Sequence, residues 1–171
     1  MNVNIRFATS DDINILAALG TTTCYEAYFK LDPSRDLADY CARVFEPENV
    51  RAEFEDVKAT FLIAESDERA IGFAKIRENK HIECLAGRNA TEIERLYVLE
   101  RMKSRGIGRL LVDRCREIGR ERGYDTLWLG VWNLNIEAQK FYEKLGMTNI
   151  GTTGFSDGKN DFVNFVYAID I

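Results

Sequence analysis

A strand, a loop with two glycines and an amphipathic helix follow one another between residues 91 and 123, and this order constrains the fold more than any other feature. The stretch TEIERLYV at 91–98 predicts a strand, and the loop KSRGIG at 103–108 places two glycines one residue apart. From 108 onward, apolar residues return at helical spacing, and Gly123 suits the position directly after the helix. We expect four residues to form the inner face of this helix: Leu110, Leu111, Cys115 and Ile118.

The start of this helix predicts an anion-binding site. The first N–H groups of a helix have no partner within it and carry partial positive charge. Glycine lets a ligand approach the backbone without a Cβ in the way. Residues 101–122 include eight basic and three acidic side chains, although the whole chain has a net charge of −5. These features favour a phosphate-binding loop over a solvated helix face, which is the alternative for a charge run.

Two common phosphate-binding motifs do not match the loop. It lacks the terminal G-K-[ST] of a P-loop and the third glycine of a dinucleotide fingerprint. It also lies near residue 105 rather than at the first strand-to-helix turn of the chain. Because a G-x-G pair by itself is also typical of a tight turn, a second motif is needed to identify the ligand.

The composition argues against several other classes of function. The negative net charge argues against nucleic acid as the main partner. With His81 as the only histidine and no C-x-x-C pair, we expect no metal site. Cys24, Cys41, Cys84 and Cys115 are interpreted as reduced structural thiols. The N-terminal residues do not have the pattern of a signal peptide, and no apolar run has the length of a membrane span, so we expect a cytoplasmic protein with no membrane partner.

The remaining patterns complete a single α/β domain over residues 1–171. Short apolar stretches predict further strands at 3–8, 60–66, 70–78, 125–131, 147–155 and 161–171. Helical spacing and capping signals predict further helices at 9–20, 33–45, 47–57 and 135–146. We expect the polar segment 78–90 to be a loop. The near-continuous apolar run DTLWLGV at 125–131 is typical of a strand that is buried on both faces.

The second motif is WNLNIEAQKFYEKLGM at 132–147. Asn135 can cap a helix, and Gly146 can end it. We expect Phe141 and Leu145 to face the core. Tyr142 then lies off the centre of this apolar face, which fits either a functional hydroxyl or a tyrosine that packs its ring at the rim of the core.

The two motifs together resemble the GNAT superfamily of acyl-CoA-dependent N-acetyltransferases. The resemblance rests on the strand RLYV, the loop KSRGIG with its helix, and the pattern N-x-x-A-x-x-F-Y-x-x-x-G from Asn135 to Gly146. It is close over residues 90–147, and the order of the other predicted elements agrees with it. It implies a mixed, mostly antiparallel central sheet of about seven strands, with a splay in the middle and helices on its flanks.

The loop and the residues just before it depart from the family pattern in three ways. Lys103 stands where the loop usually begins with Arg or Gln, and Ser104 stands where Gly is frequent. Leu99 and Glu100 replace a common proline after the strand. Lysine keeps the positive charge but lacks the bidentate geometry of arginine.

The resemblance implies acetyl-CoA as the acetyl donor. The N–H groups of the loop and helix start would bind its pyrophosphate, and the backbone at the end of the strand would pair with its pantetheine arm. The N–H near Val98 would polarise the thioester carbonyl in an oxyanion-type role, and Asn135 would contact the arm. The residues expected to bind acetyl-CoA are Leu96, Tyr97, Val98, Lys103, Ser104, Arg105, Gly106, Ile107, Gly108, Arg109, Asn135 and Tyr142.

The resemblance also implies direct transfer to an amine, without a covalent acyl-enzyme. Tyr142 is the expected general acid for the departing thiolate, since a phenol with pKa ~10 carries its proton at neutral pH. Glu92 and Glu94 share one face of their strand, and we prefer Glu94 as the base, acting directly or through water. The alternative for Glu94 is an ion pair with a basic side chain.

The predicted acceptor is a small primary amine. The three segments EIERLYV, LWLGVW and FYEKLGM further resemble the sequences of PaiA-type enzymes, which acetylate spermidine and spermine. Residues 1–70 carry a net charge of −7, which fits a polycation, with Glu26, Asp32 and Asp36 as candidate anchors. A protein N-terminus, a lysine or another small amine remains an alternative acceptor, and a non-catalytic acyl-CoA-binding protein is an alternative function. A homodimer, common in the family, remains open.

Overall fold

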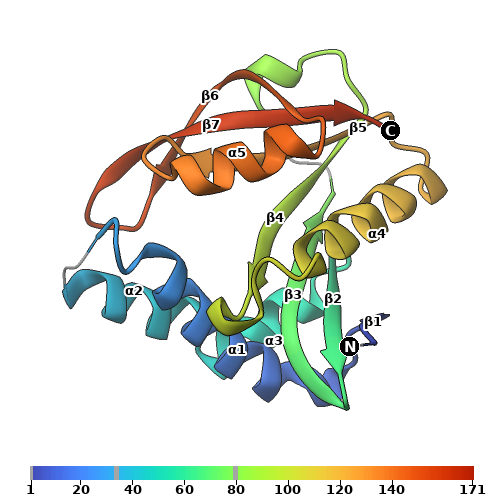
Figure 1. The fold of residues 1–171 in the computed structure, drawn as a ribbon. Coiled ribbons are helices and arrows are strands. Elements are labelled where there is room, and N and C mark those ends of the chain that lie inside the picture. Colours follow the sequence, from blue (N-terminus) through green and yellow to red (C-terminus); the bar gives the residue numbers. More distant parts are fainter. Residues whose placement is uncertain (1, 33–34, 79–80) are drawn as a thin grey trace. The chain divides into compact units, whose positions relative to one another are not determined.

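The computed structural model describes residues 2–32, 35–78 and 81–171 (Figure 1). Seven strands form a sheet in the order β1-β2-β3-β4-β5-β7-β6, in which β4 and β5 are parallel. The expected fold class, a mixed and mostly antiparallel sheet flanked by helices, is confirmed. The strands are β1 (Asn4–Phe7), β2 (Ala59–Ser66), β3 (Arg69–Arg77), β4 (Ala90–Val98), β5 (Thr126–Trp132), β6 (Thr148–Ser156) and β7 (Asp161–Asp170).

Five α-helices lie within the described residues, and each was expected from the sequence. They are α1 (Ile13–Tyr28), α2 (Arg35–Val44), α3 (Pro47–Glu55), α4 (Ile107–Glu121) and α5 (Ile136–Lys144). Three short 3-10 helices accompany them: η1 (Ser10–Asp12), η2 (Glu83–Leu85) and η3 (Glu100–Met102). The expected start of the second helix at Pro33 lies outside the described residues. The segment expected as a loop, 78–90, contains η2, and its residues 79 and 80 are also outside them.

The chain divides into two compact units, and each is described by itself. The first contains Met1–Ile76 and Arg95–Arg114, and the second contains Arg77–Glu94 and Cys115–Ile171. Within the parts of the chain that the structure describes, no helix combines the length and the apolar character that a membrane span requires.

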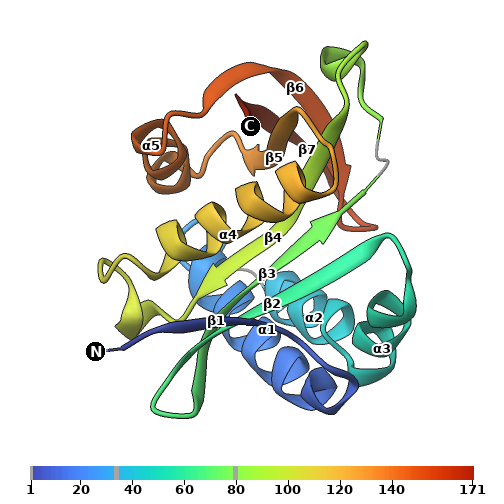
Figure 2. The same ribbon diagram turned by 90° about the vertical axis from the view of Figure 1, so that its right-hand side faces the viewer.

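In the first unit, α1, α2 and α3 lie on the same side of β1, β2 and β3 (Figure 2). The apolar spacing expected for the first helix is confirmed, since Ile13, Leu16 and Ala17 are buried in one core with residues of α2, α3 and the strands. Gly20 is required at its position because a Cβ there would lie 2.1 Å from the ring of Phe45.

The hairpin expected between residues 60 and 78 is confirmed as β2 and β3. Asp67 and Glu68 connect the two strands, and both have positive φ angles, +50° and +61°. Two successive left-handed residues form a type I′ turn, whose twist matches that of the flanking strands.

A half-buried carboxylate in the first unit joins α3 to two strands. Glu53 of α3 accepts two hydrogen bonds from the guanidinium of Arg95 on β4, at 2.6 and 2.7 Å. The ammonium of Lys75 on β3, whose side chain is almost fully buried, lies 2.9 Å from the same carboxylate. The Arg95 guanidinium also lies over the ring of Phe45, 4.7 Å from its centroid. One carboxylate therefore compensates part of the charge of a buried lysine and a partly buried arginine.

The inner face of α4 differs in one residue from the expected set. Leu111, Cys115 and Ile118 are buried as expected, but Leu110 is 43% exposed. Val112 is buried in its place, because the apolar stripe lies one helical position further along than the sequence pattern indicated. Gly123, at φ +81°, ends the helix as expected.

In the second unit, β7 pairs antiparallel with both β5 and β6. The residues of β5 from Thr126 to Leu129 are all buried, which confirms the prediction from the run DTLWLGV. Trp128 packs with Leu85 of η2 and Val166 of β7 in a separate apolar cluster.

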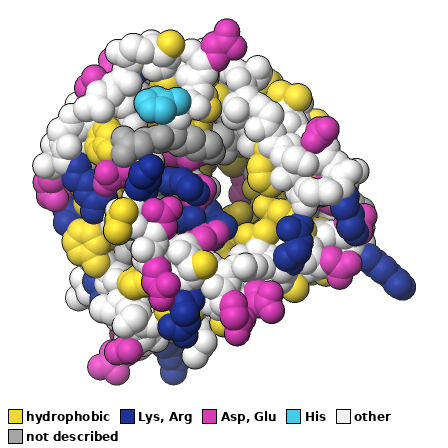
Figure 3. All heavy atoms as spheres, turned by 180° about the vertical axis from the view of Figure 1, so that it is seen from behind, with side chains coloured by type: hydrophobic (Ala, Val, Ile, Leu, Met, Phe, Trp, Pro, Cys, Tyr) yellow, Lys and Arg dark blue, Asp and Glu magenta, His cyan; other side chains and the backbone are white. Residues whose placement is uncertain are grey.

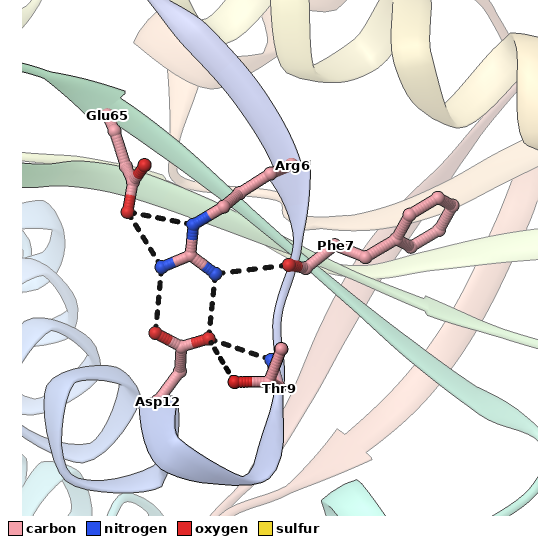
Figure 4. Close-up of polar contacts among 5 residues, drawn as sticks. All are labelled: Arg6, Phe7, Thr9, Asp12 and Glu65. Carbon is pink, nitrogen blue, oxygen red and sulfur yellow. Dashed lines mark hydrogen bonds and ion pairs between the residues drawn. The ribbon is translucent and has the colours of Figure 1, made fainter.

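An ion-pair network ties the N-terminal strand to the segment that follows it (Figure 4). Arg6 of β1 donates from Nη1 and Nη2 to the two carboxylate oxygens of Asp12, at 2.7 and 2.8 Å. Its Nε donates to Glu65 of β2, at 2.9 Å. The Asp12 carboxylate also accepts from the backbone N–H of Thr9, at 2.7 Å. The hydrogen bonds from Arg6 and Thr9 lower the pKa of Asp12 from 3.8 to about 2.

We predict that Asp12→Asn destabilises the protein near neutral pH by about 2 kcal/mol. The pKa of Asp12 is lower in the folded than in the unfolded chain, so its contribution to stability is complete above about pH 4 and is lost as the pH falls towards 2. Denaturant unfolding between pH 7 and pH 2 measures this difference. The matched control is Asp11→Asn at the exposed neighbouring position, and an equal loss in both variants would contradict the prediction.

Candidate functional site

The backbone after β4 makes one tight turn before α4 begins. The N–H of Leu99 donates to the carbonyl of Ile71 on β3 at 3.0 Å, and the N–H of Lys103 closes η3 on the carbonyl of Glu100 at 3.1 Å. The first helical hydrogen bond runs from Leu110 to the carbonyl of Gly106, at 3.1 Å. The amides of the first turn have no acceptor inside the helix, so their N–H groups point towards any ligand at its start.

Two left-handed residues shape the loop before α4. Ser104 has φ +61° and Gly106 has φ +82°. Left-handed residues that alternate with right-handed ones turn successive N–H groups to one side, which makes an anion-binding concavity. A Cβ at Gly106 would meet no atom within 4 Å, so the space beside the backbone is open there. The geometry at Ser104 also gives a physical reason for the glycine that is frequent at this position in the family.

The basic side chains of the loop are mostly exposed. Arg101, Arg105 and Arg109 are exposed, and they can contribute positive potential to the loop. Lys103 is partly exposed, and its ammonium lies 2.6 Å from the carboxylate of Glu100. The arginine or glutamine usual at the first loop position is thus replaced by a lysine that pairs with a neighbour.

Glu26 has a role that sequence reasoning missed. Its carboxylate accepts a hydrogen bond from the backbone N–H of Glu100, at 2.9 Å, and so ties α1 to the start of η3. From the sequence, Glu26 is a candidate anchor for the acceptor. The contact shows that this carboxylate already helps to place the turn that leads into the loop. Only long-range geometry reveals it, because the two residues are 74 positions apart.

The pairing of β4 with β5 is short. Its register consists of Ala90–Thr126, Thr91–Leu127 and Glu92–Trp128, whereas β4 continues to Val98 and β5 to Trp132. The splay that the family resemblance implied stays a prediction. Leu96, Tyr97 and Val98, the residues expected to pair with the donor, are half-buried and follow the end of this register.

The two candidate bases on β4 differ in their surroundings. Glu92 is 4% exposed and lies within the sheet. Glu94 is partly exposed, and Nη1 of Arg77 donates to its Oε1 at 3.2 Å. The ion pair considered for Glu94 therefore exists, and Arg77, which no local sequence signal indicated, is its partner. A nearby guanidinium favours the ionised form of a carboxylate, which is the form that can accept a proton.

The second motif forms a well-capped helix. The side-chain oxygen of Asn135 accepts from the N–H of Ala138 at 3.1 Å, which confirms it as the N-cap of α5. Gly146, at φ +83°, ends the helix, and the N–H of Met147 reaches back to the carbonyl of Tyr142 at 3.1 Å. These bonds form a Schellman motif, and the interval from Asn135 to Gly146 is thereby fixed by local geometry.

Tyr142 is more deeply placed than expected. It is 8% exposed, whereas Phe141, expected to face the core, is only half-buried. The centroid of the Tyr142 ring lies 5.1 Å from that of the Phe141 ring and 6.4 Å from that of the Tyr167 ring on β7. The expectation that Tyr142 lies off the centre of the apolar face was wrong, because α5 turns Tyr142 and Leu145, three residues apart, towards the sheet.

The predicted site residues fall into two groups. The structure brings Leu96–Val98 and the loop Lys103–Arg109 together in the first unit. Glu94, Asn135 and Tyr142 belong to the second unit.

No feature of the described residues resembles a metal centre. Among them, no group of three or more His, Cys, Asp or Glu side chains is arranged to hold a metal ion. The single histidine, His81, is exposed, and Figure 3 shows it in cyan at the surface.

Comparison with known proteins points to one family. A model of the Acetyltransferase (GNAT) family matches residues 23–147, which include the loop, Asn135 and Tyr142. An uncharacterized N-acetyltransferase of Lactobacillus delbrueckii subsp. lactis is 26% identical over 168 residues, covering 94% of this chain and 95% of its own. Streptothricin acetyltransferase of Streptomyces lavendulae is 33% identical over 101 residues, covering 58% of this chain and 50% of its own.

The fold is also similar to solved structures. The crystal structure of PaiA N-acetyltransferase from Thermoplasma acidophilum, in complex with coenzyme A, superposes over 100% of both chains with a TM-score of 0.77. The sequence identity is 20%, so this likeness concerns the fold.

We predict that Ser104→Gly stabilises the protein by about 1 kcal/mol, because a left-handed conformation costs a residue with a Cβ roughly that amount. Thermal or denaturant unfolding measures the change. The matched control is Ser10→Gly in η1, where the backbone is right-handed, and there the same exchange is expected to destabilise. Destabilisation by both exchanges would contradict the loop geometry.

Proposed function

Since the chain belongs to the acetyltransferase (GNAT) family and is an acetyl-CoA-dependent N-acetyltransferase, we propose that it acetylates a polyamine such as spermidine or spermine by direct attack in a ternary complex. The observation that carries the proposal is the loop Ser104–Arg109, whose left-handed residues Ser104 and Gly106 lead into the start of α4 within the matched region.

The residues of the loop fit the donor. The six backbone N–H groups of Ser104–Arg109 lie at the start of a helix and supply hydrogen bonds and partial positive charge to a pyrophosphate. Substitution of a side chain in the loop leaves these backbone donors in place. Arg105 and Arg109 are exposed beside them and add positive charge. Leu96, Tyr97 and Val98 would bind the pantetheine arm through their backbone, and Asn135, whose oxygen caps α5, would use its side-chain N–H₂.

Acetyl-CoA, when bound, supplies an acetyl group activated as a thioester. The N–H near Val98 would donate to the thioester carbonyl, a role in which a fixed donor lowers the barrier by a few kcal/mol. Tyr142 would give its proton to the departing sulfur, and its ring is held for this by Phe141 and Tyr167.

The acceptor amine must lose a proton before it attacks. An alkylamine has a pKa of ~10.4 and is mostly protonated at neutral pH. Glu94 would accept this proton, directly or through water. The guanidinium of Arg77 donates to this carboxylate at 3.2 Å.

Two observations support a polycationic acceptor. Residues 1–70 carry a net charge of −7, and the likeness in fold to PaiA N-acetyltransferase extends over the whole chain. The candidate anchors on the acidic side are Asp32, Asp36 and Glu26, whose carboxylate also accepts from the N–H of Glu100. The relative that acetylates streptothricin favours a second candidate, an amine-bearing antibiotic.

The experiments described below also distinguish other acceptors and a protein without catalytic activity. A protein N-terminus or a lysine would use the same donor site with a different acceptor surface. A non-catalytic acyl-CoA-binding protein would bind the donor without turnover. We further propose that residues 1–171 act as one acetyltransferase domain, and a homodimer remains a prediction that its mass in solution tests.

The donor site is tested by thermal unfolding with three ligands. We predict that acetyl-CoA raises the Tm more than ATP or NAD does at equal concentration, since the loop lacks the motifs of both nucleotide folds. A larger shift with ATP or NAD would replace the proposal with a nucleotide-binding module.

The catalytic residues are tested by two exchanges. We predict that Tyr142→Phe lowers kcat about 100-fold, because it removes the proton donor, and leaves the affinity for acetyl-CoA nearly unchanged. Glu94→Gln is expected to lower kcat, because it removes the proposed proton acceptor. Tyr124→Phe is the control, since its hydroxyl bonds Glu78 and has no proposed role. Unchanged turnover in Tyr142→Phe would remove the general acid from the mechanism.

Acceptor preference is tested by release of free CoA with a panel of amines. We predict a higher kcat/KM for spermidine and spermine than for acidic peptides. Streptothricin and a basic peptide are tested as further acceptors in the same panel. Equal turnover of polyamines and acidic peptides would remove the charge argument.

A further inference from the structure

Two of the four cysteines, scattered in the sequence, meet in the core of the first unit. Cys24 of α1 and Cys41 of α2 are free thiols, and both are buried. Their Sγ atoms lie 2.9 Å apart, with the Cys41 thiol donating to Cys24. A disulfide bond is ~2.05 Å long, so the two sulfurs need to move less than ~1 Å to form one. Seventeen positions separate them, and no sequence motif indicated the pair.

The surroundings of the pair distinguish its two members. The hydrogen bond from Cys41 lowers the pKa of Cys24, and a hydrogen bond from the hydroxyl of Tyr97 and the positive charge of Arg95 act in the same direction. Burial opposes them. The same contact raises the pKa of Cys41. The thiolate is the reactive form of cysteine, so Cys24 is the member with the nucleophilic character.

Three tyrosines near the pair stay neutral, and one cation lies beside them. Burial raises the pKa of Tyr28 to about 12 and raises those of Tyr40 and Tyr97 as well. Arg95 is held in place by its two hydrogen bonds to Glu53. The pair therefore lies beside a fixed cation and three neutral phenols, one of which, Tyr97, donates to the Cys24 sulfur.

We propose that Cys24 and Cys41 are a site of reversible oxidation, at which a peroxide joins α1 to α2 by a disulfide. The Cys24 thiolate attacks one oxygen of the peroxide, the O–O bond breaks, and Cys24 becomes a sulfenic acid while water or an alcohol leaves. The sulfur of Cys41 then attacks the sulfur of the sulfenic acid, the S–O bond breaks, and a disulfide and water form. The two sulfurs lose two electrons in total, and the peroxide gains them.

The site has two expected properties. Because both thiols are buried, a small peroxide reaches them more easily than a bulky disulfide such as oxidised glutathione does. Because the bond closes a loop between residues 24 and 41, the oxidised protein is expected to unfold at a Tm about 5 °C or more above that of the reduced protein. Neither property depends on the acetyltransferase activity.

The test is a thiol count and a peptide map on the full chain. The reduced protein is treated with hydrogen peroxide and then alkylated under denaturing conditions. We expect two alkylated cysteines instead of the four in the untreated protein, a cross-linked peptide pair that contains Cys24 and Cys41, and recovery of four thiols after dithiothreitol.

Matched variants make the assignment specific. Cys24→Ser and Cys41→Ser should each abolish the cross-link, whereas Cys84→Ser and Cys115→Ser should retain it. Four alkylated cysteines after peroxide, irreversible oxidation without a cross-link, or a cross-link through Cys84 or Cys115 would each overturn the proposal. The map of the wild-type chain decides between these outcomes even where a variant does not fold.

Discussion

The carboxyl-terminal half of β4 is fixed from three directions, and the candidate site depends on this. The guanidinium of Arg95 donates to the carboxylate of Glu53 on α3. The N–H of Leu99, directly after the strand, donates to the carbonyl of Ile71 on β3. The N–H of Glu100, in the turn that follows, donates to the carboxylate of Glu26 on α1. Glu53 also compensates the buried Lys75, so one side chain is bound to two cations. A strand held in this way gives the loop after it a fixed origin, which a site built from backbone amides requires.

Local signals explain what the sequence predicted well. Gly146 and Gly123 act through backbone conformation, and Asn135 acts through a hydrogen bond three residues away, so neighbours in the chain determine each of them. The two motifs of the site are of this kind. The apolar run of β5 was equally informative, because a strand buried on both faces leaves little room for polar residues.

Contacts between distant residues explain what the sequence did not predict. Nothing near Glu94 indicated Arg77 as its partner, and nothing near Glu26 or Cys24 indicated Glu100 or Cys41. The exposure of Leu110 and the burial of Tyr142 were missed for a related reason. Spacing gives the width of an apolar stripe on a helix, but the neighbouring elements decide where its edges lie.

The pairing of β1 with β2 bears on how the chain folds. Asn4 lies opposite Glu65, and Phe7 lies opposite Leu62, so the first strand joins the sheet across the whole of α1, α2 and α3. The β6–β7 hairpin, in contrast, joins residues such as Ser156 and Asp161 across a short turn. Closing a long loop costs more entropy than closing a short one, so the hairpin is expected to nucleate early and the N-terminal strand to dock late. A growing chain would then hold its first strand unpaired until the second had been synthesised.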